Sequence, residues 1–235
     1  MTKKILFSLM LLSIFSNLFA QKKIDSIFYS KAKENAVNFF NQKYESQLPI
    51  NKGFIYRQSL SQTEYFGTTF FGEHPTYRGD IFYSGNLYEN VELAYDLQND
   101  NIIHIKPTGE WIVLIKSKTS YFDLGNRHFI TTAADSSKAF YELLSDGKAQ
   151  LLAKHVLVIN KYLAGSFKKE ISRTAISYVN VNGQIYPARS RNDLLKAFSD
   201  KRKDVANYIK EQDLSFGKNS DSSVLSVVKY YNGLN

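Results

Sequence analysis

Residues Gly79–Thr131, GDIFYSGNLYENVELAYDLQNDNIIHIKPTGEWIVLIKSKTSYFDLGNRHFIT, decide the fold of this chain. Turn-forming residues interrupt this stretch at short intervals, at Gly85-Asn86, Asn99-Asp100-Asn101, Pro107-Thr108-Gly109 and Gly125-Asn126. Glycine, asparagine, aspartate and proline at such spacing are typical of chain reversals between short strands. The stretch is therefore predicted to be a meander of antiparallel strands.

The side-chain pattern between these turns indicates how the strands are covered. Val91, Leu93 and Tyr95 alternate with polar or small residues, and so do Ile103 and Ile105, so each strand is expected to bury one face and leave the other partly wet. The apolar run Trp111–Ile115 has no polar face, which is typical of a strand covered on both sides. We expect this run to be the central strand.

Two further hairpins are predicted after the meander. Asp146-Gly147 separates the apolar segments 140–144 and 151–159, and Asn182-Gly183 separates 176–181 from 184–186. Both dipeptides suit tight hairpin turns because their residues tolerate positive φ. With 16 Tyr and 17 Phe in the chain, the composition also favours strands. The expected fold is mainly β (α+β), an antiparallel meander forming a sandwich or partial barrel.

Helices are expected at both ends of the mature chain. Residues 25–44 carry aromatic and small residues at helical spacing, which predicts an amphipathic helix whose aromatic stripe packs on the sheet. Residues 190–235 form the predicted helical tail, with three short apolar stripes and a capping serine at Ser190. The domain plan is a leader at 1–20 and one β-rich domain at 21–235.

The first twenty residues have the layout of a cleavable secretory signal peptide. Lys3 and Lys4 precede an apolar run that is too short to span a bilayer comfortably, and small residues end the segment near Ala20. No later segment has the roughly 18 apolar residues of a membrane helix. We therefore expect an exported protein that is periplasmic, displayed on the outer surface or secreted.

Charge and cysteine content narrow the classes of partner. The mature chain would have 28 basic and 22 acidic residues, a formal charge of +6, with the two signs interleaved. No basic block or nucleic-acid-binding module occurs, so nucleic acid is not an expected partner, whereas a cell-envelope protein or polymer is. The absence of cysteine removes disulfides, thiol nucleophiles and zinc-thiolate sites.

Several segments together resemble a family of exported, β-rich bacterial proteins of unassigned function. The resemblance rests on the leader, LYENVELAYDLQND at 87–100, FYELLSDGKAQLLAKH at 140–155, YVNVNGQIYPARSRNDLLKAFSDKRKDVANYIKEQ at 178–212 and VVKYYN at 227–232. It implies export and a β-rich fold with a C-terminal helical region. It implies no catalytic residue.

Catalytic motifs are scarce. The chain has no Gly-x-Ser-x-Gly nucleophile elbow, no phosphate-binding glycine loop and no His-x-x-x-His pair, so no cofactor or metal is expected. One alternative remains, a cross-strand cluster of Asp96, His104, Asp123 and His128 serving a hydrolase or a metal-dependent enzyme. The competing interpretation is that these residues are ordinary polar positions on the wet faces of strands.

The segment Ser59–Tyr77 is the candidate ligand-binding loop because aromatic residues alternate there with glycines. Its candidate contact residues are Tyr65, Phe66, Phe70, Phe71 and Tyr77. The alternative is a loop that packs its aromatic rings into the core. The sequence thus favours a non-enzymatic binding or envelope-associated module. The enzyme above and a carrier of a small apolar ligand are the rival hypotheses.

Overall fold

The computed structural model describes residues 27–33, 35–36, 39, 43–58, 64–132, 139–162, 167–217 and 221–234. The chain divides into two units, Met1–Leu48 and Pro49–Asn235. In the first unit, every described residue from 27 to 44 is helical, and the 3₁₀ helix η1 (Glu45–Gln47) follows. The rest of the predicted helix 25–44 lies outside the described residues, so the packing of its aromatic stripe stays a prediction.

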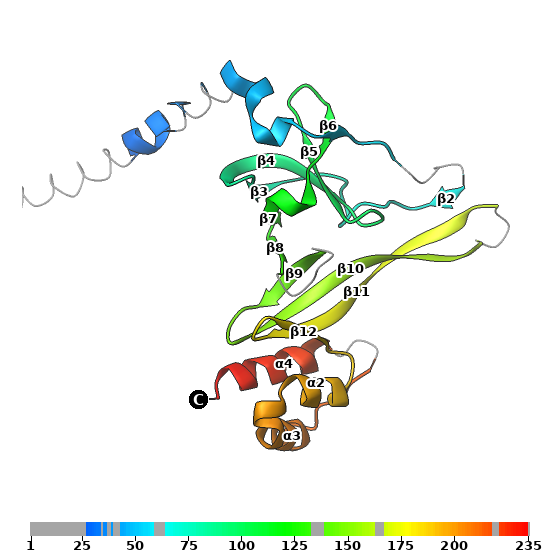
Figure 1. Cartoon of the computed structure of the whole chain (residues 1–235). Helices are drawn as coiled ribbons and strands as arrows, with labels where there is room; N and C mark the ends of the chain where they lie inside the picture. Colours follow the sequence, from blue (N-terminus) through cyan, green and yellow to red (C-terminus); the bar gives the residue numbers. More distant parts are fainter. Residues whose placement is uncertain are drawn as a thin grey trace, which may run out of the picture. The chain divides into compact units, whose positions relative to one another are not determined.

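The second unit is built on one antiparallel sheet of twelve strands, with a short parallel contact at β2 (Figure 1). The strands are β1 (Phe54–Ile55), β2 (Tyr65–Phe66), β3 (Tyr77–Tyr83), β4 (Asn86–Asp96), β5 (Asn101–Ile105), β6 (Trp111–Val113), β7 (Thr119–Leu124), β8 (Arg127–Thr131), β9 (Phe140–Ser145), β10 (Ala149–Tyr162), β11 (Lys169–Val181) and β12 (Gln184–Pro187). Two 3₁₀ turns accompany them, η2 (Pro49–Asn51) and η3 (Lys116–Lys118). The predicted mainly β fold is confirmed, and the sheet is open.

The strand order shows two meanders that leave β3 in opposite directions. The order is β1-β6-β5-β4-β3-β7-β8-β9-β10-β11-β12, and β2 pairs with β11 off this path. After β6 the chain therefore returns past three strands, and β7 pairs with the free side of β3. This return passes through η3, where no turn dipeptide signals it in the sequence.

The expectation that Trp111–Ile115 is the central strand is wrong. Only Trp111–Val113 forms a strand, β6, which lies next to the short terminal strand β1. The run is nevertheless covered on both sides: Trp111 packs against Tyr56 and Phe70 on one face, and Ile112 is buried on the other. Loop segments supply this cover, so an apolar run indicates coverage and not position in the sheet.

The strand faces are also drier than the alternation predicts. In β4, Leu93, Ala94, Tyr95 and Asp96 are all buried, and so is His104 in β5. Residues 69–71 lie along this end of β4, where the Phe71 amide donates to the Tyr95 carbonyl and the Leu97 amide donates to the Thr69 carbonyl. Phe70 of this loop packs on Ala94 and covers the face of β4 that was expected to be wet, whereas His104 is opposed to Leu93 and lies on the other face.

An aromatic cluster forms the middle of the core. Tyr95, Phe122, Phe129 and Phe140 come from four strands and are almost fully buried, and Phe122 stacks on Phe129 with ring centroids 4.9 Å apart. Most of the other ring pairs meet edge to face, an arrangement that adds to the stabilisation from burial. The buried hydroxyl of Tyr95 donates to Asp100 over 2.6 Å.

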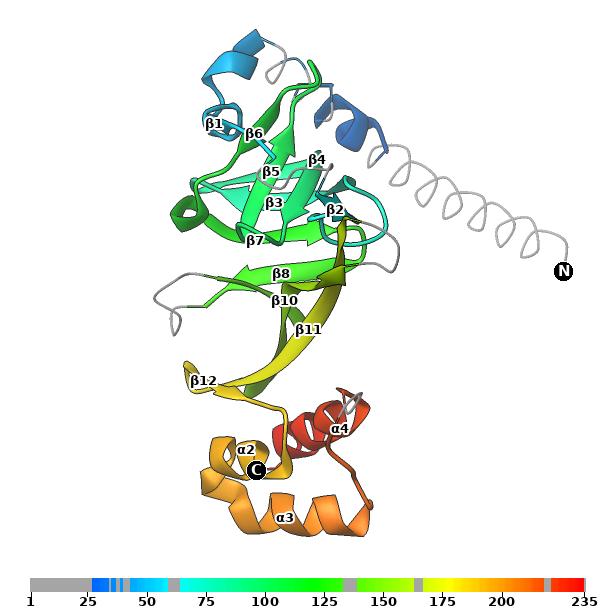
Figure 2. The ribbon, with the colours of Figure 1, turned by 90° about the vertical axis from the view of Figure 1, so that its right-hand side faces the viewer.

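The C-terminal helices cover the turn end of the second meander (Figure 2). They are α2 (Arg191–Ala197), the 3₁₀ turn η4 (Ser199–Lys201), α3 (Arg202–Glu211) and α4 (Asp221–Asn232). Ser190 caps α2 by accepting from the Asp193 amide, as the sequence predicts. Asn232 closes the β9–β10 turn by accepting from the Ala149 amide at 2.7 Å and donating to its carbonyl at 2.9 Å.

Both later hairpins occur where the turn dipeptides predict them. Asn182 and Gly183 have φ values of 51° and 79°, the left-handed pair that a tight antiparallel hairpin requires. Gly147 lies beside the Asn232 side chain with φ 151°, so a Cβ there would clash. No helix in the described part of the chain is long and apolar enough to cross a membrane.

The contact between Tyr231 of α4 and Asp200 predicts that the protein loses stability at high pH. Burial and the hydrogen bond to Asp200 raise the pKa of Tyr231 from its ordinary 10.0 to about 12. The unfolded chain therefore ionises first, so stability present below pH 10 should fall as the pH rises towards 12. Urea unfolding across this range should show a smaller fall for Tyr231→Phe than for the wild type.

The exposed Tyr162 provides the matched control. Tyr162→Phe should reproduce the pH dependence of the wild type, because the Tyr162 side chain is 64% exposed. Equal slopes for all three proteins would contradict the role given to Tyr231.

Candidate functional site

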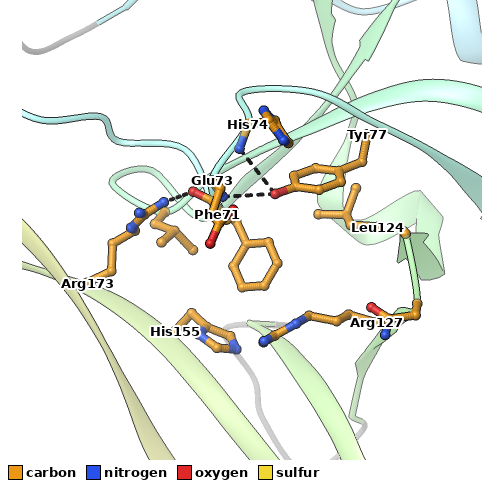
Figure 3. A pocket seen from close by; sticks show the side chains of 12 residues that line it. Phe71, Glu73, His74, Tyr77, Leu124, Arg127, His155 and Arg173 are labelled. Carbon is orange, nitrogen blue, oxygen red and sulfur yellow. Dashed lines mark hydrogen bonds between the residues drawn. The ribbon is translucent and has the colours of Figure 1, made fainter.

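A pocket of about 430 Å³ opens on the face of the sheet that carries the aromatic cluster (Figure 3). Its walls come from the loop before β3, the β7–β8 turn and strands β8, β10 and β11. The lining residues are Phe71, Gly72, Glu73, His74, Tyr77, Leu97, Leu124, Gly125, Asn126, Arg127, His155 and Arg173. The volume lies within the range of small-molecule sites.

The strand register brings three polar side chains together at this pocket. Phe129, Glu142 and Ala153 are directly opposed across β8, β9 and β10, so their side chains share one face. Arg127 and His155 are each two residues from these positions and therefore project on the same side. Both lie diagonal to Glu142, within reach of its carboxylate.

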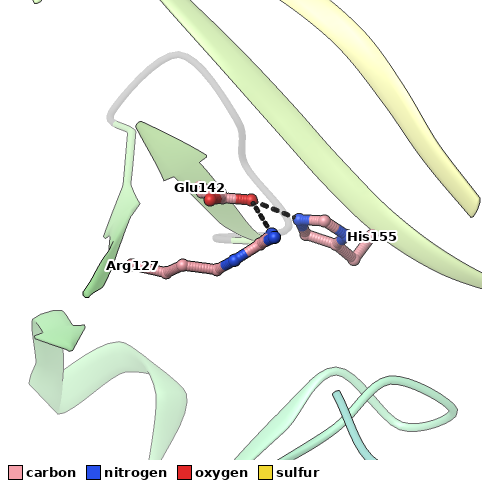
Figure 4. A network of polar contacts seen from close by, with 3 residues as sticks. All are labelled: Arg127, Glu142 and His155. Carbon is pink, nitrogen blue, oxygen red and sulfur yellow. Dashed lines mark hydrogen bonds and ion pairs between the residues drawn. The ribbon is translucent and has the colours of Figure 1, made fainter. Parts of the chain in front are cut away.

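Glu142 is the centre of this group (Figure 4). Its Oε2 accepts from Nε2 of His155 at 2.6 Å and from a guanidinium N–H of Arg127 at 3.1 Å. The Glu142 side chain is 8% exposed and that of His155 12%, whereas Arg127 is 48% exposed. Burial of a carboxylate is costly unless it is paired, and here two donors meet one oxygen. The Arg127 guanidinium also lies over the Phe71 ring at 5.3 Å.

A second arginine reaches the pocket from β11. Arg173 is opposed to Leu157, so it shares the face that carries His155. Its guanidinium donates to the Phe70 carbonyl at 3.1 Å and, in a very short contact, to the Gly72 carbonyl. Among the described residues, none of the ion pairs includes Arg173. Two carbonyls hold this cation in place without neutralising it.

The loop before β3 forms the opposite wall. Phe71 is buried and contacts Phe129 and His155, with ring centroids 5.0 and 4.8 Å away. Gly72 adopts φ 78°, and a Cβ there would collide with the Tyr77 hydroxyl. That hydroxyl accepts from the amides of Glu73 and His74, which fixes the loop as a wall of the pocket.

The chemistry of the walls suits binding better than nucleophilic catalysis. The lining residues include no serine or threonine, and the Tyr77 oxygen already accepts two amide hydrogen bonds. His155 paired with Glu142 has the arrangement of an oriented base, but among the described lining residues the one hydroxyl is that of Tyr77, which holds the loop. What the walls do offer is a set of guanidinium and imidazole N–H groups above an apolar floor.

The four residues of the predicted cross-strand cluster do not form one site. His104 and His128 lie on β5 and β8, which are four strand spacings, roughly 19 Å, apart in the sheet. A shared metal ion would need its ligand atoms about 2 Å away. The described residues also contain no group of three or more histidines and carboxylates that could hold a metal ion.

Each member of that cluster has local partners instead. Asp123 and His128 are opposed across β7 and β8, on the side of the sheet away from the pocket. His128 Nδ1 lies 2.6 Å from Asp123 Oδ1. Asp96 is buried at the end of β4, where it accepts from Asn99, the Gln98 amide and Tyr56. His104 is buried with Nδ1 3.2 Å from the Glu92 carbonyl. Sheet register separates residues that are close in sequence.

The five candidate contact residues of the aromatic loop have different surroundings. Phe70 and Phe71 are buried, and only Phe71 and Tyr77 line the pocket. Tyr65 and Phe66 form β2 beside β11, and Phe66 is 63% exposed. A ligand-binding role for these residues stays a prediction, while residues 59–63 of the loop lie outside the described part of the chain.

Sequence reasoning missed Arg127, Glu142, His155 and Arg173. Their spacing in sequence carries no motif, because each comes from a different strand. One signal was available: Glu142 is a single acid within the apolar run 139–144, which is unusual for a buried strand. Comparison of the chain with protein-family models, curated proteins and solved structures gives no significant match.

The buried carboxylate gives a stability prediction. Glu142→Ala should lower the free energy of unfolding by about 1–3 kcal/mol, because two buried hydrogen bonds are lost. Glu142→Gln keeps an acceptor and should cost less. Glu110→Ala removes an exposed carboxylate paired with Lys106 and should leave the urea midpoint close to that of the wild type. Similar midpoints for Glu142→Ala and Glu110→Ala would contradict this role.

Proposed function

We propose that this protein is a non-enzymatic, exported binding module whose pocket takes a small organic acid. The observation that carries the proposal is Arg173, a cation held at the pocket by two carbonyls and paired with no carboxylate among the described residues. A guanidinium is a fork of N–H donors matched to carboxylate or phosphate oxygens. An acidic group on the ligand supplies the missing charge.

Arg127 supports the same assignment from the other side of Phe71 (Figure 3). Glu142 balances the charge of Arg127, so the main contribution of Arg127 is to orient N–H donors. One N–H donates to the Glu142 carboxylate, and the remaining N–H groups lie on the exposed part of the side chain. His155, on the same carboxylate, is oriented in the same way. Pre-oriented donors lower the entropic cost of binding.

The apolar part of the pocket defines the rest of the ligand. Phe71, Leu97 and Leu124 are buried or nearly so and line the pocket with the ring of Tyr77. A volume of about 430 Å³ admits a ligand with a ring or a short chain in addition to its acidic group. Glu73 is the one acidic side chain among the described lining residues, and it disfavours ligands whose whole surface is anionic.

Substitution of the two arginines tests the proposal. Probes are benzoate, phenyl phosphate and a short-chain dicarboxylate, each with a neutral amide or alcohol of the same shape, measured by isothermal titration calorimetry at fixed ionic strength. We expect an acid to bind and its neutral analogue to fail. Arg173→Met should weaken that binding by about tenfold or more, since a charged hydrogen bond contributes about 1.5–3 kcal/mol. Arg127→Met should weaken it as well.

Arg191→Met is the matched control, because Arg191 is exposed on α2 and does not line the pocket. Equal loss in all three variants would indicate a general charge effect. Binding of acids and neutral analogues with equal affinity would overturn the proposal and favour the carrier of apolar ligands.

Export is the second part of the proposal, supported by the leader pattern at 1–20, which lies outside the described residues. Mass spectrometry of the protein recovered from a cell with an outer membrane should give a mature chain that begins at Gln21. Replacing Leu11 and Leu12 in the apolar run by arginine should leave the full-length chain in the cytoplasm. An uncut chain in the wild type would contradict export through a cleavable leader.

A further inference from the structure

Glu73 is a pocket residue to which an acidic ligand alone gives no partner (Figure 3). It lies in the loop before β3, where its amide donates to the Tyr77 hydroxyl at 2.9 Å, so its backbone is held in the pocket wall. The residue is exposed, and its carboxylate makes no hydrogen bond or ion pair with any described residue. This carboxylate is therefore available to a ligand.

The loop places Glu73 next to Arg173. The peptide unit that joins Gly72 to Glu73 contacts both walls, because its carbonyl accepts from the Arg173 guanidinium and its N–H donates to Tyr77. The carbonyl and N–H of a trans peptide point in opposite directions, so this unit lies between Arg173 and Tyr77 (Figure 3). The pocket thus presents a cation and an anion close together, and none of the ion pairs between described residues joins them.

The charges around the pocket favour a ligand that carries both signs. Glu142 neutralises Arg127, which leaves Arg173 and Glu73 as the unpaired arginine and the unpaired acid among the described lining residues. A ligand with only an acidic group would pair with Arg173 and bring a second negative charge towards Glu73. Like charges brought together cost binding free energy, whereas an ammonium group beside the acid pairs with the Glu73 carboxylate.

We infer that the ligand is an α-amino acid with an apolar side chain, whose carboxylate binds Arg173 and whose ammonium group binds Glu73. The inference rests on the proposed function, because it takes the acidic group on Arg173 from there. An α-amino acid carries its two charged groups on neighbouring carbon atoms, which suits a cation and an anion that meet at one peptide unit of the loop. Its side chain then contacts the apolar part of the lining, Phe71, Leu124 and the ring of Tyr77.

Other classes of ligand leave one of these charges unmatched. A monoamine leaves Arg173 without an anion. A dicarboxylate sets its second carboxylate against Glu73. Both are therefore expected to bind more weakly than the amino acid of the same skeleton.

Three probes that share one skeleton separate the two charges. Phenylalanine has both charged groups, hydrocinnamate lacks the ammonium group and phenethylamine lacks the carboxylate. In isothermal titration calorimetry at neutral pH and fixed ionic strength, the wild type should bind phenylalanine about tenfold or more tightly than hydrocinnamate, because a charged hydrogen bond is gained. Phenethylamine should also bind more weakly than phenylalanine.

Glu73→Gln tests the residue that makes this distinction. It should bring the affinities for phenylalanine and hydrocinnamate together, because the amide has no charge to pair with the ammonium group. Since Glu73 is exposed, the variant should fold with an unchanged urea midpoint. Glu89→Gln removes an exposed carboxylate of β4 outside the pocket lining and should keep the preference for phenylalanine.

Equal affinity of the wild type for phenylalanine and hydrocinnamate, no binding of phenylalanine, or a preference that persists in Glu73→Gln would overturn the inference. The proposed function is judged separately, by whether Arg173→Met weakens the binding of hydrocinnamate. Hydrocinnamate that binds through Arg173 as tightly as phenylalanine would leave the proposed function standing and remove only the amino acid.

Charge reversal provides an independent measurement. Benzylmalonate has a carboxylate in the place of the ammonium group of phenylalanine. The wild type should prefer phenylalanine, and Glu73→Lys should prefer benzylmalonate, because the variant presents two cations to the two carboxylates. A Glu73→Lys protein that keeps the wild-type order of affinities would overturn the inference.

Discussion

The antiparallel register of β8, β9 and β10 is the constraint on which the candidate site depends. Glu142 is opposed to Phe129 on one side and Ala153 on the other, so Arg127 and His155 can meet only at its carboxylate. A slip of one residue in either pairing would turn Glu142 or its partners to the opposite face of the sheet. The aromatic cluster opposes such a slip, because Phe122, Phe129 and Phe140 would leave the core with it.

The pocket combines groups that folding by itself would disfavour. A buried carboxylate is stable here because Arg127 and His155 both donate to it, and Arg173 is held by carbonyls from the loop before β3. The same loop buries the side chain of Phe71 in the core, and the carbonyl of the next residue, Gly72, accepts from Arg173 at the pocket. Burial of the Phe71 side chain therefore holds in position the loop carbonyls that accept from Arg173.

Strands β10 and β11 connect the two ends of the second unit. At the β9–β10 turn, Ala149 and Leu151 pack with the C-terminal helices, and Asn232 holds the turn. Further along the same strand His155 lines the pocket. The C-terminal helices and the candidate site thus contact one continuous strand, which is why its register matters in both places.

Local patterns in the sequence determined the turns and much of the strand and helix content. Asn182-Gly183 forms its hairpin because both residues accept positive φ, and Ser190 begins α2 because its hydroxyl caps a free amide. The return of β7 to β3, the position of Trp111–Val113 next to the terminal strand β1 and the burial of His104 depended on which distant segments cover which strands. The candidate site is of the same kind, since Arg127, Glu142, His155 and Arg173 come from four strands. Turns follow from the φ preferences of adjacent residues, whereas a cross-strand site follows from register, which only the packing of the whole sheet decides.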